Sequence, residues 1–172
     1  SFVHSQNECH SYSLGAGLTL RYAINHPEHV AGQLFTNSTS AFATADVTGP
    51  IRENGERIIG QYREQGMDAV DAISVHPRNA KRLPRDLHDA LLADCRLLDP
   101  VGVAMSIVYT NGHSSVRDIV HQTRVPTLLL CGERERRFDV HRTFAEQQLP
   151  DLLVEPLDAG HAVNAEAADH FN

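Results

Sequence analysis

Apolar residues recur every three or four positions after Leu14, as on one face of a helix: Ala16, Leu20, Ala23 and Ile24. His26-Pro27-Glu28 ends this predicted helix, because proline cannot continue it. The mostly apolar residues 30–36 predict a buried strand, and the polar residues 37–40 have the composition of a loop. The first part of the chain therefore predicts a helix followed by a strand.

Residues 42–122 lack the alternation of a strand and predict a set of short helices. Asp99-Pro100 is typical of a helix start, with an acidic N-cap before a proline in the first turn. The apolar residues after it would share one face: Val101, Ala104, Met105 and Val108. A second helix over residues 86–95 would present Leu87, Leu91, Leu92 and Cys95 together. Prolines and glycines interrupt this region, which we interpret as an inserted helical subdomain.

Strand and helix alternate again from residue 123. The continuous apolar run over residues 125–131 predicts a parallel strand buried on both faces. A helix near residues 139–148, a strand over 152–157 and a helix from about residue 163 to the end follow. This order predicts the α/β class with a mostly parallel sheet, formed by residues 1–41 and 123–172 around the insertion at 42–122.

Length and composition agree with a globular domain, since 41% of the 172 residues are hydrophobic and 22% are charged. The formal net charge of -7 argues against a nucleic-acid-binding surface, which needs clustered lysine and arginine. No segment approaches the roughly 20 apolar residues of a membrane span. We therefore expect a small-molecule substrate and no nucleic-acid or membrane partner.

The cysteines and histidines indicate neither a disulfide framework nor a metal site. Cys9, Cys95 and Cys131 are odd in number and far apart, which favours a reducing, cytoplasmic compartment. The 11 histidines are scattered and none falls in an HExxH spacing, so we interpret most of them as surface residues. We expect no metal and no cofactor.

Ser13 is the candidate nucleophile, in the sequence Ser11-Tyr12-Ser13-Leu14-Gly15 before the first predicted helix. A nucleophile elbow is a sharp strand-to-helix turn, so it needs small residues two positions before and after the serine. The helix dipole and the N–H of Leu14 could then stabilise an oxyanion. A serine-rich turn that caps the helix is the alternative. Ser11 is the weaker nucleophile candidate, because the residue two positions after it is a serine and not a glycine.

Two later loops supply an acid and a base. Gly132-Glu133-Arg134-Glu135 follows the apolar run directly, at the strand end where sites of open α/β sheets gather. Asp158-Ala159-Gly160-His161 places a histidine on a short glycine-bearing loop after the last strand. A solvated charge run and a surface histidine are the alternatives. With Ser13, the chain has the order serine, acid, histidine, each at a strand end.

The chain resembles the α/β-hydrolase fold superfamily in three segments: Ser13-Leu14-Gly15, residues 125–133 and Ala159-Gly160-His161. The resemblance frames nearly the whole chain and gives the helical insertion the position of the family's variable cap. It implies that Ser13 attacks a carbonyl, His161 accepts and returns the proton, and Glu135 orients the imidazole. Glu135 is favoured because the family's acid falls three residues after the strand-ending glycine, and Glu133 is the alternative.

The resemblance also implies parts that precede this sequence. The family's second oxyanion donor comes from a loop before the nucleophile, whereas only twelve residues precede Ser13. We therefore expect a fragment without the N-terminal strands of the sheet, in which residues 2–9 form the strand that leads to the elbow. Residues 4–8 of that strand are polar where apolar residues are usual.

The predicted function is hydrolysis of an ester, thioester or lactone through an acyl-enzyme. Cleavage of a carbon–carbon bond in a diketone-like substrate is one alternative, and a non-catalytic binding protein is another. Basic residues of the insertion could bind a carboxylate or form a solvated helix face: Arg52, Arg57, Arg78, Lys81, Arg82 and Arg85. The identity of the substrate and the oligomeric state stay open.

Overall fold

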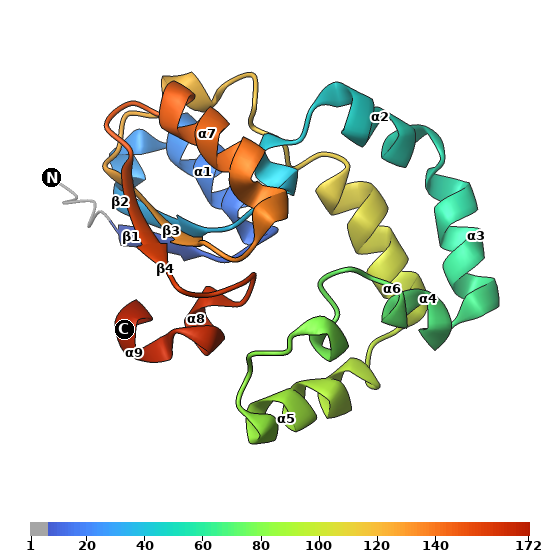
Figure 1. Ribbon diagram of the computed structural model, residues 1–172. Helices are drawn as coiled ribbons and strands as arrows, with labels where there is room; N and C mark the ends of the chain where they lie inside the picture. Colours follow the sequence, from blue (N-terminus) through green and yellow to red (C-terminus); the bar gives the residue numbers. More distant parts are fainter. Residues whose placement is uncertain (1–6) are drawn as a thin grey trace, which may run out of the picture. The chain divides into compact units, whose positions relative to one another are not determined.

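Two units are distinguished in the computed structural model, which describes residues 7–172 (Figure 1). The core unit comprises residues 7–44 and 114–172, and the helical unit comprises Ala45–His113. These bounds differ at both ends from the predicted insertion over residues 42–122. Residues 114–122 belong to the core unit because Val116 and Val120 are buried in its main hydrophobic cluster. Phe42 is buried in the same cluster.

A parallel sheet in the order β1-β2-β3-β4 forms the centre of the core unit and confirms the predicted α/β class. The strands are β1 (Asn7–Ser11), β2 (Val30–Thr36), β3 (Thr127–Gly132) and β4 (Leu153–Leu157). β2 has the predicted bounds, whereas β3 starts two residues later than predicted. Residues 1–6, which include most of the predicted first strand, lie outside the described residues. Because the strands are parallel, their carboxyl ends lie along one edge of the sheet.

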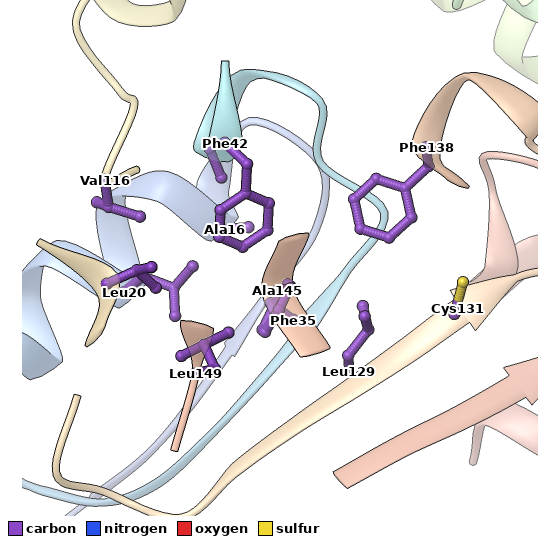
Figure 2. Close-up of a cluster of buried hydrophobic side chains, with 12 residues drawn as sticks. Ala16, Leu20, Phe35, Phe42, Val116, Leu129, Cys131, Phe138, Ala145 and Leu149 are labelled. Atoms are coloured by element: carbon purple, nitrogen blue, oxygen red, sulfur yellow. The ribbon is translucent and has the colours of Figure 1, made fainter. Parts of the chain in front are cut away.

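Each face of the sheet packs against its own helices, because successive side chains of a strand point to opposite faces. Phe35 and Leu129 pack with residues of α1 (Gly15–Asn25) and α7 (Asp139–Gln148) (Figure 2). Leu128 and Leu130 pack with residues of α8 (Val163–Glu166) and α9 (Ala168–Phe171). Complete burial of one such side chain contributes about 1.5–3 kcal/mol. The apolar run in β3 is thus explained by helices on both faces.

The helix α1 buries the predicted stripe, since Ala16, Leu20 and Ala23 are fully buried. It ends at Asn25, two residues before Pro27. Short 3₁₀ turns connect the elements of the core unit: η1 (Pro27–His29), η2 (Ser40–Phe42), η5 (Val120–Gln122) and η6 (Arg136–Phe138). Ser13 lies in the short turn between the end of β1 at Ser11 and the start of α1 at Gly15.

The predicted C-terminal helix from residue 163 is divided into α8 and α9, so the single helix was wrong. Ala167 has φ -132° and ψ 43°, which is not helical. Val163, Ala167 and Phe171 nonetheless pack in one cluster against the sheet. Their contact with the sheet, and not a continuous helix, accounts for the apolar spacing in the sequence.

The helical unit consists of α2 (Ala45–Glu53), α3 (Gly55–Gln65), α4 (Met67–Asp71), η3 (Pro77–Asn79), α5 (Arg85–Cys95), α6 (Pro100–Met105) and the π-helix η4 (Ser106–Asn111). Asp99 caps α6 as predicted, because its carboxylate accepts the N–H groups of residues 101 and 102 at 3.3 and 3.1 Å. Ala104 and Val108 pack with Ile59 of α3. Met105 is 47% exposed, contrary to the prediction, because it lies about 100° around the helix from Ala104.

The three cysteines are free thiols in the structure. Among residues 7–172, no helix combines the length and the apolar character that a membrane crossing requires.

Candidate active site

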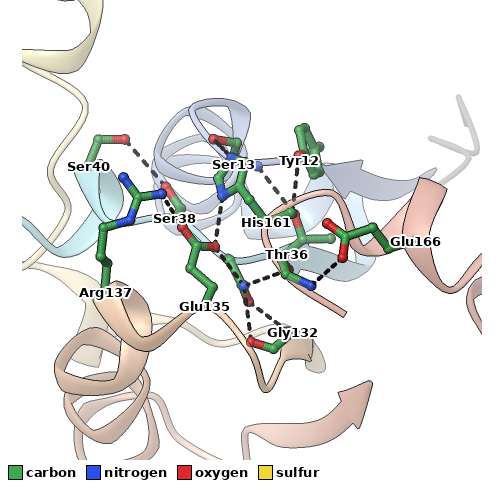
Figure 3. Close-up of polar contacts among 12 residues, drawn as sticks. Tyr12, Ser13, Thr36, Ser38, Ser40, Gly132, Glu135, Arg137, His161 and Glu166 are labelled. Carbon is green, nitrogen blue, oxygen red and sulfur yellow. Dashed lines mark hydrogen bonds and ion pairs between the residues drawn. The ribbon is translucent and has the colours of Figure 1, made fainter. Parts of the chain in front are cut away.

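Four side chains, each following a different strand, meet at the carboxyl edge of the sheet. Figure 3 shows three of them, Ser13, Glu135 and His161, next to one another. Ser13 follows β1, Asn37 follows β2, Glu135 follows β3 and His161 follows β4. Parallel strands bring their carboxyl ends to one edge, so residues far apart in the sequence become neighbours there. The structure thus brings Ser13, Glu135 and His161, the three residues chosen from the sequence, to one place.

The turn that carries Ser13 is strained. Among the described residues, only Ser13 (φ 49°) and Asp151 are non-glycine residues with positive φ. Such a conformation costs of order 1–3 kcal/mol and persists only where surrounding contacts impose it. The N–H of Ser13 donates to Oγ1 of Thr36 at 3.3 Å, and the carbonyl of Ser13 accepts the N–H of Ala16 at 3.0 Å. These bonds hold the sharp β1-to-α1 turn that the sequence predicted.

Ser11 has a different environment from Ser13. Its hydroxyl lies 3.4 Å from the carbonyl oxygen of Leu34 and 2.7 Å from Oγ1 of Thr19. These bonds fix the Ser11 side chain between β2 and α1. The structure therefore separates the two serines, and it is Ser13 that contacts the histidine.

His161 bridges Ser13 and Glu135. Its Nε2 lies 2.9 Å from Oγ of Ser13, and its Nδ1 lies 2.8 Å from Oε2 of Glu135. A carboxylate only accepts hydrogen bonds, so Nδ1 carries the proton in the neutral imidazole and Nε2 is left to accept the hydroxyl proton of Ser13. This arrangement can withdraw a proton from Ser13 as the hydroxyl attacks an electrophile.

Glu135 is buried, with 6% of its surface exposed, and both carboxylate oxygens are hydrogen-bonded. Oε2 also accepts Nδ2 of Asn37 at 2.8 Å, and Oε1 accepts a guanidinium N–H of Arg137 at 2.8 Å. Burial raises the pKa of this carboxyl, but the bonds from His161, Asn37 and Arg137 outweigh it and lower the pKa below its ordinary value. Ionised Glu135 therefore stabilises the fold at neutral pH, and this stability is lost as the pH falls through the lowered pKa.

Glu133, the alternative acid, lies on the surface. Its backbone N–H donates to the carbonyl of Leu157 at 3.0 Å, which continues the pairing of β3 with β4. His161 contacts Glu135 and not Glu133.

The N–H of Leu14 lies at the start of α1, as the sequence predicted for an oxyanion donor. Within residues 7–172 it has no hydrogen-bond acceptor. The N–H groups of Gly15 and Ala16 bond to the carbonyls of Tyr12 and Ser13 at 2.9 and 3.0 Å. Leu14 therefore offers a backbone donor beside Ser13 at the positive end of the helix dipole.

Sequence reasoning missed three residues that support the site. Asn37 bonds to Glu135, and Tyr12 donates its hydroxyl to the carbonyl of His161 at 3.1 Å. Burial, followed by the charges of Glu135 and Glu166, raises the pKa of Tyr12, so its phenol stays protonated as a donor. Glu166 accepts the N–H of Gly160 at 2.8 Å. Asn37 had a signal in the sequence, since it directly follows a predicted buried strand, and Glu166 follows the Ala159-Gly160-His161 segment that carries the family resemblance.

Three of the basic residues of the helical unit contact carbonyl or carboxylate oxygens within that unit. A guanidinium N–H of Arg52 donates to a backbone carbonyl at 2.8 Å. Arg78 lies 3.6 Å from Asp71, and Arg85 lies 3.8 Å from Asp89. Surface ion pairs of this kind are typical of solvated helices, so these contacts support no carboxylate site by themselves.

One group in the described part of the chain has side chains that could hold a metal ion: His26, Glu28 and His29. Their ligand atoms lie within 4.8 Å of one another. They lie in and beside η1, which precedes β2, whereas Ser13 lies at the other end of α1. This group is therefore separate from the candidate active site.

Gly132 has no room for a side chain, because β3 and the loop of His161 approach each other there. A Cβ at Gly132 would overlap the carbonyl oxygen of Gly160 and lie 2.8 Å from that of Ala159. We expect Gly132→Ala to lower the free energy of unfolding by about 1–3 kcal/mol in urea denaturation. It should also slow any reaction of Ser13, because the loop that carries His161 must move.

Gly32→Ala is the matched control, because its Cβ would lie 3.6 Å from its nearest neighbour, the carbonyl oxygen of Pro126. Its unfolding free energy should stay within about 0.5 kcal/mol of the wild type. Equal stabilities of Gly132→Ala and Gly32→Ala would contradict the close approach of β3 to the His161 loop.

The chain is similar in sequence to a curated protein and similar in structure to several solved proteins. No family model matches the sequence. A curated protein of Bacillus subtilis (strain 168), named "Putative 2-succinyl-6-hydroxy-2,4-cyclohexadiene-1-carboxylate synthase", is 25% identical over 167 residues, which cover 90% of this chain and 59% of that protein. MenH from S. aureus has a TM-score of 0.80 at 16% identity, over 97% of this chain and 65% of that structure.

Solved structures of hydrolytic enzymes are similar to the chain as well. The enol-lactonase from Burkholderia xenovorans LB400 has a TM-score of 0.69 at 21% identity, over 98% of this chain and 63% of that structure. An esterase from Thermogutta terrifontis has a TM-score of 0.69 at 19% identity, over 96% of this chain and 61% of that structure. The chain spans less than two thirds of the length of each of these relatives.

Proposed function

Because this chain has the α/β-hydrolase fold, we propose that it carries the triad of a serine hydrolase that cleaves an ester, thioester or lactone. The observation that carries the proposal is a pair of hydrogen bonds made by His161. Its Nε2 lies 2.9 Å from Oγ of Ser13, and its Nδ1 lies 2.8 Å from Oε2 of Glu135. The strained turn at Ser13 supports it, because strain of this kind gathers at functional sites. The helical unit would then act as the cap.

In the proposed reaction, Oγ of Ser13 bonds to the carbonyl carbon while its proton passes to Nε2 of His161. Glu135 stabilises the resulting imidazolium through Nδ1. The carbonyl oxygen becomes an oxyanion, to which the N–H of Leu14 donates. The bond to the leaving group then breaks as His161 returns the proton to it, which leaves Ser13 acylated. A water molecule, deprotonated by Nε2 of His161, then bonds to the acyl carbon. The bond between that carbon and Oγ of Ser13 breaks, Oγ takes the proton back from His161, and the acid is released.

A second candidate function follows from the curated relative of 25% identity. The same residues would then serve the synthase reaction that its name describes, whose product carries a carboxylate. In the proposed hydrolysis, protein side chains supply the nucleophile and the base, so we expect no cofactor, and a cytoplasmic location agrees with the three free thiols.

The test treats the full-length protein that contains this chain with a fluorophosphonate probe, which reacts covalently with activated serines. We expect labelling, and turnover within a panel of acyl esters, thioesters and lactones. Turnover of diketones alone would favour carbon–carbon bond cleavage, and turnover of the synthase's substrate alone would favour the second candidate. A folded protein with neither labelling nor turnover would contradict the proposal and favour a binding protein.

A further inference from the structure

Asn37 joins three of the four loops that form the candidate site, and we infer that it is a positioning residue that holds Glu135 in its ionised, His161-oriented state. The inference rests on the proposed function, since it assigns to Asn37 control over the pH range in which Ser13 reacts. Asn37 directly follows β2 and is 1% exposed. An amide buried to this extent must find partners for its oxygen and both of its protons.

The contacts of Asn37 fix the orientation of its amide. Oδ1 accepts the backbone N–H of Gly132 at 3.0 Å. Nδ2 donates to Oε2 of Glu135 at 2.8 Å and lies 3.5 and 3.4 Å from the carbonyl oxygens of Gly132 and Gly160. The opposite orientation would turn the amide oxygen toward three acceptors and the NH2 group toward a donor. Only the observed orientation therefore satisfies the neighbours.

One oxygen of Glu135, Oε2, accepts the hydrogen bonds of both His161 and Asn37. Oε2 accepts Nδ1 of His161 and Nδ2 of Asn37, each at 2.8 Å. Asn37 thereby limits where this carboxylate oxygen can lie and leaves one direction open for His161. Because Gly132 ends β3 just before the loop of the acid and Gly160 lies in the loop of the histidine, the amide also sets the spacing between these two segments.

The chemistry at position 37 explains why an amide is needed. A carboxylate there could accept the N–H of Gly132 but could not donate to Glu135, and two carboxylates so close share a proton instead of both ionising. An apolar residue of the same size would leave a buried oxygen of Glu135 with one bond fewer. Asparagine supplies a donor without adding charge.

Among the described residues, three other titratable groups face Glu135, each from a different element. His161 comes from the loop after β4, Arg137 from η6 and Tyr12 from the turn before α1. The hydrogen bonds of His161 and Arg137 favour the anion, whereas burial opposes it. Removal of the Asn37 donor therefore shifts the balance toward a protonated Glu135 while the bonds of His161 and Arg137 remain.

The test compares Asn37→Asp and Asn37→Leu with the wild type by two measurements. The titration of Glu135 is followed by 13C NMR of its carboxyl carbon, and the rate of fluorophosphonate labelling is measured from pH 5 to pH 9. We expect the midpoint of Glu135 to rise by about one pH unit in Asn37→Leu and further in Asn37→Asp. In Asn37→Leu, labelling at pH 5 should fall by up to about fourfold relative to the wild type and recover toward pH 9.

Two variants are used because one of them could fail to fold. Asn37→Leu leaves the buried N–H of Gly132 without an acceptor, whereas Asn37→Asp keeps an oxygen there, so the second variant decides the question when the first does not fold. Asn25→Asp adds the same charge at the exposed end of α1, about 15 Å along the helix from Gly15, and should leave both measurements unchanged.

The outcomes separate the two proposals. The role of Asn37 is overturned if both variants match the wild type in two respects: the titration midpoint of the Glu135 carboxyl and the labelling rate at the acid end of the pH range. A wild-type protein that no probe labels contradicts the serine hydrolase, but the carboxyl titration still decides whether Asn37 controls Glu135. Equal loss of labelling at every pH, with an unchanged midpoint, shows a purely structural role and also overturns the inference.

Discussion

Substitution of Ser13 by alanine is expected to abolish fluorophosphonate labelling and to lower the rate of acyl-ester hydrolysis by at least about a thousandfold. The reason is that Oγ of Ser13 is the atom that His161 contacts through Nε2, at 2.9 Å. Without it, no side chain at the elbow can form the acyl-enzyme. The labelling is measured by gel fluorescence or mass spectrometry of the intact protein, and hydrolysis by steady-state kinetics.

Ser11→Ala is the matched control, because it removes the same group two residues away. The Ser11 hydroxyl bonds to Leu34 and Thr19, so its loss should reduce stability slightly and leave labelling intact. Labelling that survives Ser13→Ala and disappears in Ser11→Ala would show that the assignment of the nucleophile is wrong.

Replacement of Glu135 by glutamine is expected to lower the turnover number by roughly 10⁴-fold, the order found when a triad acid is changed to its amide. Glutamine keeps the size of the side chain, but its NH2 group can donate to Nδ1 of His161. The imidazole proton then moves to Nε2, which can no longer accept the proton of Ser13. Unfolding free energy should be measured in parallel, because Asn37 and Arg137 also lose their carboxylate partner.

Glu133→Gln removes the same charge from the exposed glutamate two residues earlier. We expect its turnover number and labelling rate to stay within about twofold of the wild type, in line with the small effects of surface substitutions. A loss in Glu133→Gln as large as that in Glu135→Gln would assign the acid to the wrong glutamate.

The pattern of apolar and polar residues was sufficient to predict an element where its local preference and its packing against the sheet favour the same structure. β2 has the predicted bounds because its residues are apolar on both faces and the next segment is polar. α1 buries the predicted stripe because the sheet lies on that side. Ser13, Glu135 and His161 could be chosen because a parallel sheet brings all its carboxyl ends to one edge.

Pattern failed where packing alone decides the structure. Val163, Ala167 and Phe171 have helical spacing, but contact with the sheet holds them in two short helices instead of one. Val116 and Val120 are apolar and helical in spacing, and nothing local indicates that they belong to the core unit. Asn37 is a common loop residue in any sequence, and its role depends on partners almost 100 residues away.

The parallel order of the four strands also bears on how the protein acquires reactivity during folding. Ser13 and His161 are 148 positions apart in the sequence. The strands β2 and β3 pair although the whole helical unit lies between them in the sequence, so their pairing closes a long loop of chain. Contacts this distant form late, because each requires a large loss of chain entropy first. Fluorophosphonate labelling during refolding should therefore lag behind the recovery of helical circular dichroism, so that a reactive Ser13 reports the completed sheet.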